Sequence, residues 1–107
     1  MEHMTRINVA KDFSRWPAGR YRSDGPYSGE VFRDDILVPA LDKAEVVEVE
    51  LDGARGYGSS FLEEAFGGLV RLGRFTSDQL LRRLRVVSND DPSLSQEIQA
   101  YIRHSHA

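Results

Sequence analysis

The sequence predicts a single α/β domain in which helices pack against a small mixed sheet of about four strands. Short strand patterns alternate with helical patterns along the chain, which is typical of this class. The chain has 107 residues, a length typical of one domain. Hydrophobic residues make up 40% of it, enough for a modest core. We therefore expect one domain over residues 1–107, with its core at about 7–104.

The beginning of the chain predicts two short strands. Residues 7–10 alternate weakly between apolar and polar side chains, as a strand does. Residues 14–26 are rich in proline and glycine, which favours a hairpin or an ordered loop. In the hairpin alternative, residues 19–22 form its second strand.

Residues 28–41 predict the first long helix. Ser28 can cap its N-terminus, and apolar side chains recur at every fourth residue, at Phe32, Ile36 and Ala40. Pro39 lacks a backbone N–H, so we expect the helix to end or kink near Val38.

Residues 46–51 give the clearest strand pattern, because apolar and acidic side chains alternate there. Val47, Val49 and Leu51 should face the core. A loop with several glycines follows, and then a helix whose apolar residues recur in pairs between Phe61 and Val70. Gly73 is expected to end that helix.

Two features of this second helix stand out. Ser60 and Glu63 match the capping-box pattern S/T-x-x-E/Q, in which each side chain bonds the other residue's backbone N–H. Gly67 and Gly68 lie inside the helix, where each glycine costs about 1 kcal/mol relative to alanine. The backbone there should pack closely inside the protein or meet a partner surface.

The last third of the chain predicts a helix, a strand and a helix. Thr76 and Gln79 form a second capping box before a short helix that ends near Leu84. Residues 84–88 are a strand candidate. A final helix, capped by Asp91 and ending at about residue 104, carries an apolar stripe of Leu94, Ile98 and Ile102.

Composition argues against several kinds of chemistry. The chain has no cysteine, so disulfides and thiolate sites are excluded. Its histidines, His3, His104 and His106, lie near the two ends, where we find no metal-ligand or Ser-His-Asp arrangement. We predict no enzymatic activity, no metal and no cofactor.

Charge and hydropathy indicate where in the cell the protein is expected. The formal net charge is −3, which does not favour nucleic acid. The N-terminus lacks the apolar region of a signal peptide, and the apolar runs are too short to span a bilayer. We expect a cytoplasmic protein that binds neither nucleic acid nor membrane.

The glycine-rich segment between the strand and the second helix is the strongest candidate site. It lacks the lysine of a phosphate-binding P-loop, and Phe61 occupies the third glycine position of the dinucleotide fingerprint. Helix capping and tight turns explain it without a ligand, but it can also contact a phosphate or a partner protein. The residues of this interaction or ligand loop are Arg55, Gly56, Tyr57, Gly58, Ser59 and Ser60.

A second candidate lies near the N-terminus, where arginines alternate with aromatic residues. Such residues can hold anions or anchor protein partners, although packed aromatics and solvated arginines also explain the pattern. The candidate contacts are Arg15, Trp16, Arg20, Tyr21 and Arg22.

The order of these elements resembles a known family. The strand, the loop ending in Gly58-Ser59-Ser60 and the following helix resemble the STAS domain of anti-sigma factor antagonists. With the segments GRY, GPYSGEVFR and GYGSSFLEEAFGGL, the chain resembles the bacterial STAS-like domain family of unknown function, over residues 7–87.

The resemblance implies a single STAS-like domain with a regulatory role. In anti-sigma factor antagonists a partner kinase phosphorylates the second serine of this loop, which corresponds to Ser60, with Ser59 as the first serine and Gly58 in place of an aspartate. Glu63 and Glu64 lie within a turn of that position and would repel a phosphate. The implied partner is an ATPase or a kinase-like regulator.

Two hypotheses of function follow. The first is a non-enzymatic module that binds another protein through the loop and the start of the second helix. The second is a domain that binds a nucleotide or phosphate on the Ser59 and Ser60 amides, with Arg20 or Arg22 on the anion.

Overall fold

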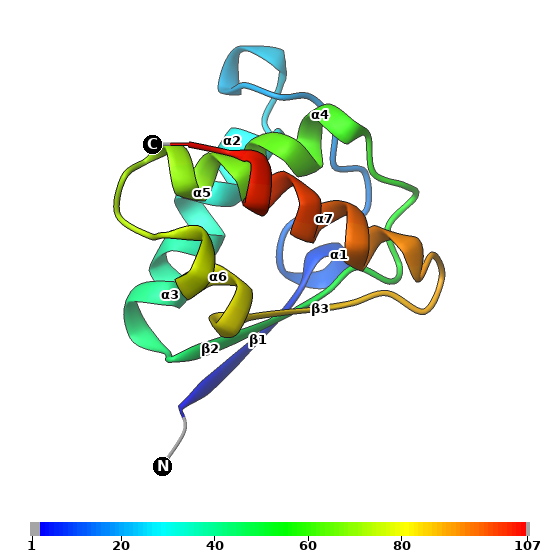
Figure 1. Ribbon diagram of the computed structural model, residues 1–107. Coiled ribbons are helices and arrows are strands. Elements are labelled where there is room, and N and C mark those ends of the chain that lie inside the picture. Colours follow the sequence, from blue (N-terminus) through cyan, green and yellow to red (C-terminus); the bar gives the residue numbers. More distant parts are fainter. Residues whose placement is uncertain (1–2, 107) are drawn as a thin grey trace.

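The computed structural model describes residues 3–106, and it confirms the predicted α/β class (Figure 1). Three strands form one sheet in the order β1-β2-β3, with bounds Met4–Asn8, Val46–Glu50 and Leu84–Val87. Both strand pairs are parallel, so the sheet is parallel and has three strands instead of about four.

The helices gather on one side of this sheet (Figure 1). On the central strand, Val47 and Val49 are fully buried beneath them, as the alternating pattern predicts. The opposite face carries charged side chains, and there Arg6 forms an ion pair with Glu48 at 3.1 Å. The carboxyl ends of all three parallel strands therefore lie at one edge, where sites gather in sheets of this kind.

Residues 14–26 form an ordered loop, which is one of the two predicted alternatives, and the hairpin alternative is wrong. The first strand lies earlier than expected, and its place is taken by α1, Val9–Asp12. Residues 19–22 form no strand, and the last of them begins a short 3-10 helix, Arg22–Asp24. The Asp24 carboxylate accepts the backbone N–H groups of Arg20 and Tyr21 at 3.1 and 2.8 Å. These local bonds use the amides that a strand would have paired across a sheet.

The first long helix runs through Pro39 instead of ending before it. It consists of α2, Gly29–Phe32, a π-helical turn, Arg33–Leu37, and α3, Val38–Lys43. Ser28 caps it through a bond to the Val31 N–H, as predicted. The Val38 N–H bonds the carbonyl five residues back. This wider turn makes room for a proline ring, which in a regular α-helix would clash with the preceding turn.

The second helix has the same three parts. These are α4, Ser59–Leu62, a π-helical turn, Glu63–Gly67, and α5, Gly68–Arg71. The predicted Ser60–Glu63 capping box is wrong, because the cap residue is Gly58 and no side chain caps this end. The Glu63 carboxylate instead accepts from Arg71 at 2.6 Å. The helix ends just before Gly73, whose φ of 78° explains why glycine is needed there.

The remaining elements agree with the sequence. The Thr76–Gln79 capping box begins α6, Ser77–Arg83, with both reciprocal bonds present. The last helix, α7, is Ser93–His104. It begins one residue later than predicted, because Pro92 is its cap residue and no side chain caps it, although the Asp91 carboxylate accepts the Ser93 N–H at 3.2 Å.

The core lies between the sheet and the two long helices. Its three largest side chains are Phe32, Phe61 and Phe66, all with almost no exposure. The apolar stripe of α7 closes the core, with Ile98 and Ile102 buried. Within residues 3–106, no helix is long and apolar enough to cross a membrane.

Candidate functional site

The candidate site lies at the carboxyl edge of the sheet, where the loops after β2 and β3 meet. The Asp52 carboxylate ties these loops together by accepting the backbone N–H groups of Asn89 and Asp90 at 2.9 and 2.8 Å. These hydrogen bonds, that from Asp90 first, lower the pKa of Asp52 below its ordinary value. The Asp52 carboxylate therefore links the two loops just beyond the ends of β2 and β3.

A cavity of about 200 Å³ lies between these two loops. Apolar side chains, among them Leu51 and Leu94, form part of its wall, whereas Arg55, Asp90 and Asp91 bring charge to it. Half of the predicted loop lines this cavity, namely Arg55, Gly56 and Tyr57. Sequence reasoning identified these three residues of the wall but not its residues from the segment 88–94, which only the fold brings beside them.

Tyr57 fixes the predicted loop against the core. Its hydroxyl donates to the Leu51 carbonyl at 2.7 Å, and its ring lies 5.9 Å from that of Phe61. Desolvation raises the pKa of this hydroxyl above its ordinary range, and the nearby carboxylates of Asp52 and Asp90 raise it further. Tyr57 thus holds the loop in place, and its hydroxyl stays protonated.

Ser59 and Ser60 are the first two residues of α4, and both are exposed. The preceding residue, Gly58, is also exposed and has open space where a side chain would be. Because no side chain caps this helix, its first amides face outward, as in helix N-termini that accept anions. The structure therefore presents both predicted serines at the surface.

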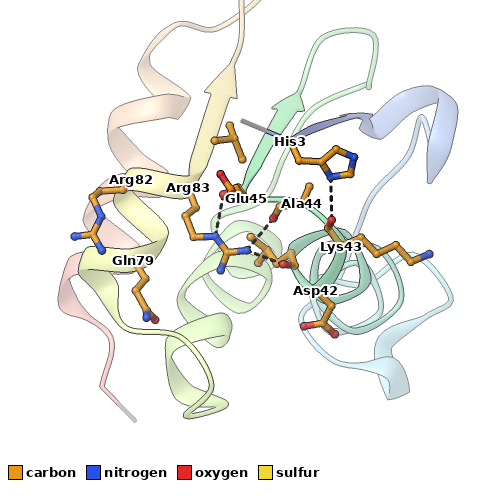
Figure 2. Close-up of a pocket in the computed structure, with 10 residues that line it drawn as sticks. His3, Asp42, Lys43, Ala44, Glu45, Gln79, Arg82 and Arg83 are labelled. Atoms are coloured by element: carbon orange, nitrogen blue, oxygen red, sulfur yellow. Dashed lines mark hydrogen bonds between the residues drawn. The ribbon is translucent and has the colours of Figure 1, made fainter. Parts of the chain in front are cut away.

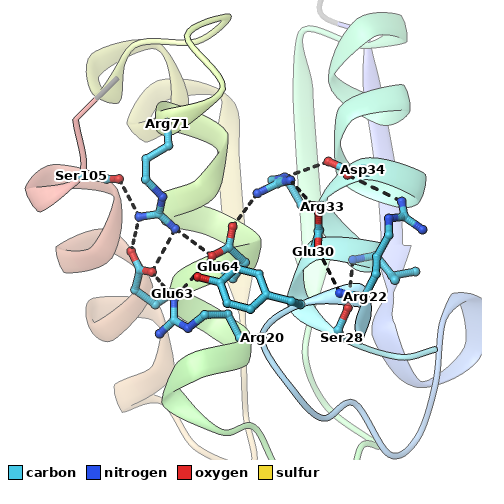
Figure 3. Close-up of polar contacts among 12 residues, drawn as sticks. Arg20, Arg22, Ser28, Glu30, Arg33, Asp34, Glu63, Glu64, Arg71 and Ser105 are labelled. Carbon is cyan, nitrogen blue, oxygen red and sulfur yellow. Dashed lines mark hydrogen bonds and ion pairs between the residues drawn. The ribbon is translucent and has the colours of Figure 1, made fainter. Parts of the chain in front are cut away.

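One turn further on, Glu63 and Glu64 are held by arginines (Figure 3). Arg20 donates to Glu63 at 2.7 Å and lies 3.4 Å from Glu64. Arg71 donates to both, at 2.6 and 3.2 Å. The hydrogen bond from Arg71 and then that from Arg20 lower the pKa of Glu63. The repulsion that the sequence suggested near Ser60 is thus offset by two arginines.

The buried part of this network joins the two long helices. Arg33 donates to Glu64 at 2.6 Å, and their side chains are only 10% and 8% exposed. A side chain at Gly68 would come within 2.7 Å of Arg33, and one at Gly67 would press on Glu63. The glycine pair therefore serves internal packing, because its missing side chains leave room for the ion pairs. The two π-helical turns begin at Arg33 and Glu63, and neither turn was predicted.

The other predicted N-terminal residues lie in two places. Arg22 pairs with Asp35 at 3.0 Å, on the side of the first long helix. Arg15 and Trp16 are exposed and lie beside the candidate loop, because the Arg55 N–H donates to the Arg15 carbonyl at 2.8 Å. Tyr21 is also exposed. The structure thus brings Arg15 and Trp16 to the loop and directs Arg20 and Arg22 to carboxylates.

A larger cavity, of about 590 Å³, lies at the opposite edge of the sheet (Figure 2). Arg83 lies in its wall and donates to the carbonyls of Leu41, Ala44 and Glu45 at 2.6, 2.9 and 2.9 Å. Carbonyls at a helix end commonly find such a cation. The guanidinium therefore fixes the end of α3, and we do not place the functional site in this cavity.

The fold and the loop define an α/β domain with an exposed strand-to-helix junction at the carboxyl edge of a parallel sheet. A family model described as a STAS-like domain of unknown function (DUF4325) matches residues 28–94, and the chain belongs to this family. The match includes Ser59 and Ser60 and begins after the arginine–aromatic segment. No curated protein and no solved structure matched the chain.

Proposed function

We propose that this protein is a non-enzymatic regulatory module of the cytoplasm that binds another protein through residues 52–60 and the start of α4. The observation that carries this proposal is the exposure of Ser59 and Ser60 on a junction that is otherwise firmly held. The class of partner, a kinase-like ATPase, rests on the resemblance to anti-sigma factor antagonists. In this proposal Ser60 is the regulatory serine.

Electrostatics support a phosphate on Ser60. The free amides and the positive end of the helix dipole stabilise an added phosphate. Glu63 and Glu64, which would oppose it, are already paired with Arg20 and Arg71. The charge next to Ser60 is therefore less negative than the sequence suggests.

Affinity purification of the full chain from its native host tests the proposal, with mass spectrometry for partners and for phosphoserine. We expect one protein to be enriched with the wild type and with Ser60→Ala, and lost with Ser60→Glu. Gln99→Glu, which adds the same charge at an exposed position of α7, is the matched control. Equal capture by Ser60→Glu, or no specific partner at all, would contradict the proposal.

The alternative is a domain that binds a small anion, and the cavity beside Arg55 favours it. At about 200 Å³ the cavity is smaller than typical ligand pockets of about 300–1,000 Å³. It suits a phosphate group better than a whole nucleotide. Saturation at about 100 times the dissociation constant raises stability by about 2.7 kcal/mol, which a thermal-shift assay detects. An unchanged melting temperature with millimolar phosphate and nucleotides would remove this alternative.

A further inference from the structure

Trp16 is the most exposed large hydrophobic residue in the described part of the chain, at 62%. Its backbone is nevertheless well held, because its N–H donates to the buried Ser14 hydroxyl at 2.9 Å. Pro17, the next residue, is buried. The indole is therefore presented to solvent from a fixed backbone, as anchor residues of protein interfaces are.

Three other exposed residues belong to backbone segments that adjoin the one carrying Trp16. Arg15 adjoins Arg55 through the backbone hydrogen bond of 2.8 Å between them. Tyr27, which is 46% exposed, accepts the Ala18 N–H through its carbonyl at 3.0 Å. Tryptophan, tyrosine and arginine are the residue types enriched at the energetic centres of interfaces. We call Arg15, Trp16, Tyr27 and Arg55 the Trp16 surface.

The two arginines of this surface differ from most others in the chain. Within residues 3–106 the structure pairs neither Arg15 nor Arg55 with a carboxylate. Six other arginines do form such pairs, namely Arg6, Arg20, Arg22, Arg33, Arg71 and Arg74. Two cations on hydrogen-bonded backbone segments, one of them next to Trp16 in the chain, are thus available to pair with carboxylates of a partner.

We propose that the Trp16 surface binds an acidic segment of the partner protein, with an apolar side chain of that segment packed on the indole. The inference rests on the proposed function and names the chemistry of its partner. Carboxylates fit the guanidinium groups of Arg15 and Arg55 as charge-assisted, bidentate acceptors. Asp90 and Asp91, which line the cavity with Arg55, and the net charge of −3 oppose the continuous row of phosphates in nucleic acid. A short segment with one or two carboxylates needs only the two guanidinium groups.

The test is a selection of random 12-residue peptides, displayed on phage, against the immobilised full chain. The enriched peptides are then synthesised and titrated against the protein in solution. Because the chain has a single tryptophan, its emission reports directly on Trp16. We expect enriched peptides with net negative charge and an apolar residue, and a shift of emission to shorter wavelength as the indole loses water.

Two double variants show whether binding depends on the surface itself. Arg15→Glu with Arg55→Glu should weaken the peptide at least tenfold. The matched control is Lys43→Glu with Arg82→Glu, which changes the net charge equally at two exposed cations of the opposite edge (Figure 2). It should change affinity less than twofold. Circular dichroism verifies that both double variants are folded.

Several results would overturn the inference. These are no enrichment, enrichment of basic or neutral peptides, unchanged Trp16 emission at saturation, or equal weakening by the two double variants. Tighter binding of a 12-nucleotide oligothymidine than of the peptides would assign the surface to nucleic acid instead. A host partner lost with Ser60→Glu but retained by the Arg15/Arg55 double variant would refute this inference alone. If the selection yields acidic peptides but affinity purification finds no host partner that depends on Ser60, the proposed function alone would be refuted.

Discussion

Replacing Glu64 with glutamine should destabilise the protein strongly, because the change leaves Arg33 buried beside a neutral group. Removing one partner of a buried ion pair costs about 3–5 kcal/mol. Arg33 keeps its bond to Asp34 at 2.8 Å, and glutamine keeps the shape of the side chain. We therefore expect the lower end of this range, about 3 kcal/mol, from a total of about 5–15 kcal/mol for such a domain.

Urea denaturation followed by far-ultraviolet circular dichroism measures this loss. With a slope of about 1–3 kcal/mol/M, the midpoint should fall by about 1 M or more. The control is Asp42→Asn, which breaks the exposed pair with Arg74, whose side chains are 47% and 52% exposed. That change should cost at most about 1 kcal/mol.

A double variant separates charge burial from lost packing. Arg33→Met together with Glu64→Gln removes the buried cation that has lost its Glu64 partner, so part of the lost stability should return. If Glu64→Gln alone costs no more than Asp42→Asn, the buried pair does not stabilise the fold as reasoned here. If the double variant is less stable than Glu64→Gln, the penalty comes from packing and not from charge.

Two further predictions concern acid stability and a close backbone contact. Since its bonds to Arg71 and Arg20 lower the pKa of Glu63 below the ordinary 4.5, the stability they give is present above that pH and lost as pH falls through the folded-state pKa. Glu63→Gln should therefore be less stable than wild type at neutral pH, and it should lose less stability on acidification. A constant difference between the urea midpoints of the two proteins across the acid range would contradict this. Gly29→Ala should lower the free energy of unfolding by about 1–3 kcal/mol, because the added Cβ would overlap the Phe61 carbonyl oxygen. The exposed control Ser59→Ala should change it by no more than about 0.5 kcal/mol. Equal urea midpoints for these two variants would show that the helices separate without cost.

Local patterns were enough to predict much of the fold. The alternation in residues 46–51 correctly predicted the central strand, and Thr76 with Gln79 correctly predicted the start of α6. Both signals depend on residues within a few positions of one another. Backbone geometry and solvent exposure decide them with little influence from the rest of the chain.

The predictions that failed involved side chains with a choice of partners. Glu63 had a local partner in a capping box, but Arg20, 43 positions away in the sequence, and Arg71 bind its carboxylate instead. Asp24 likewise bonds nearby amides and prevents the expected strand. A sequence pattern shows that a carboxylate can cap a helix, but only the packed structure shows which donor lies closer.

The same ion pairs connect the two surfaces on which the proposals depend. Arg20 joins the segment that carries Trp16 to the helix that begins at Ser59, through its bond to Glu63. The backbone bond between Arg55 and Arg15 joins them a second time. With two attachments the segments should move as one body, so a partner can contact Trp16 and Ser60 without ordering either segment first. Weakening the network at Glu63 should therefore reduce binding at both positions, although Glu63 need not contact the partner.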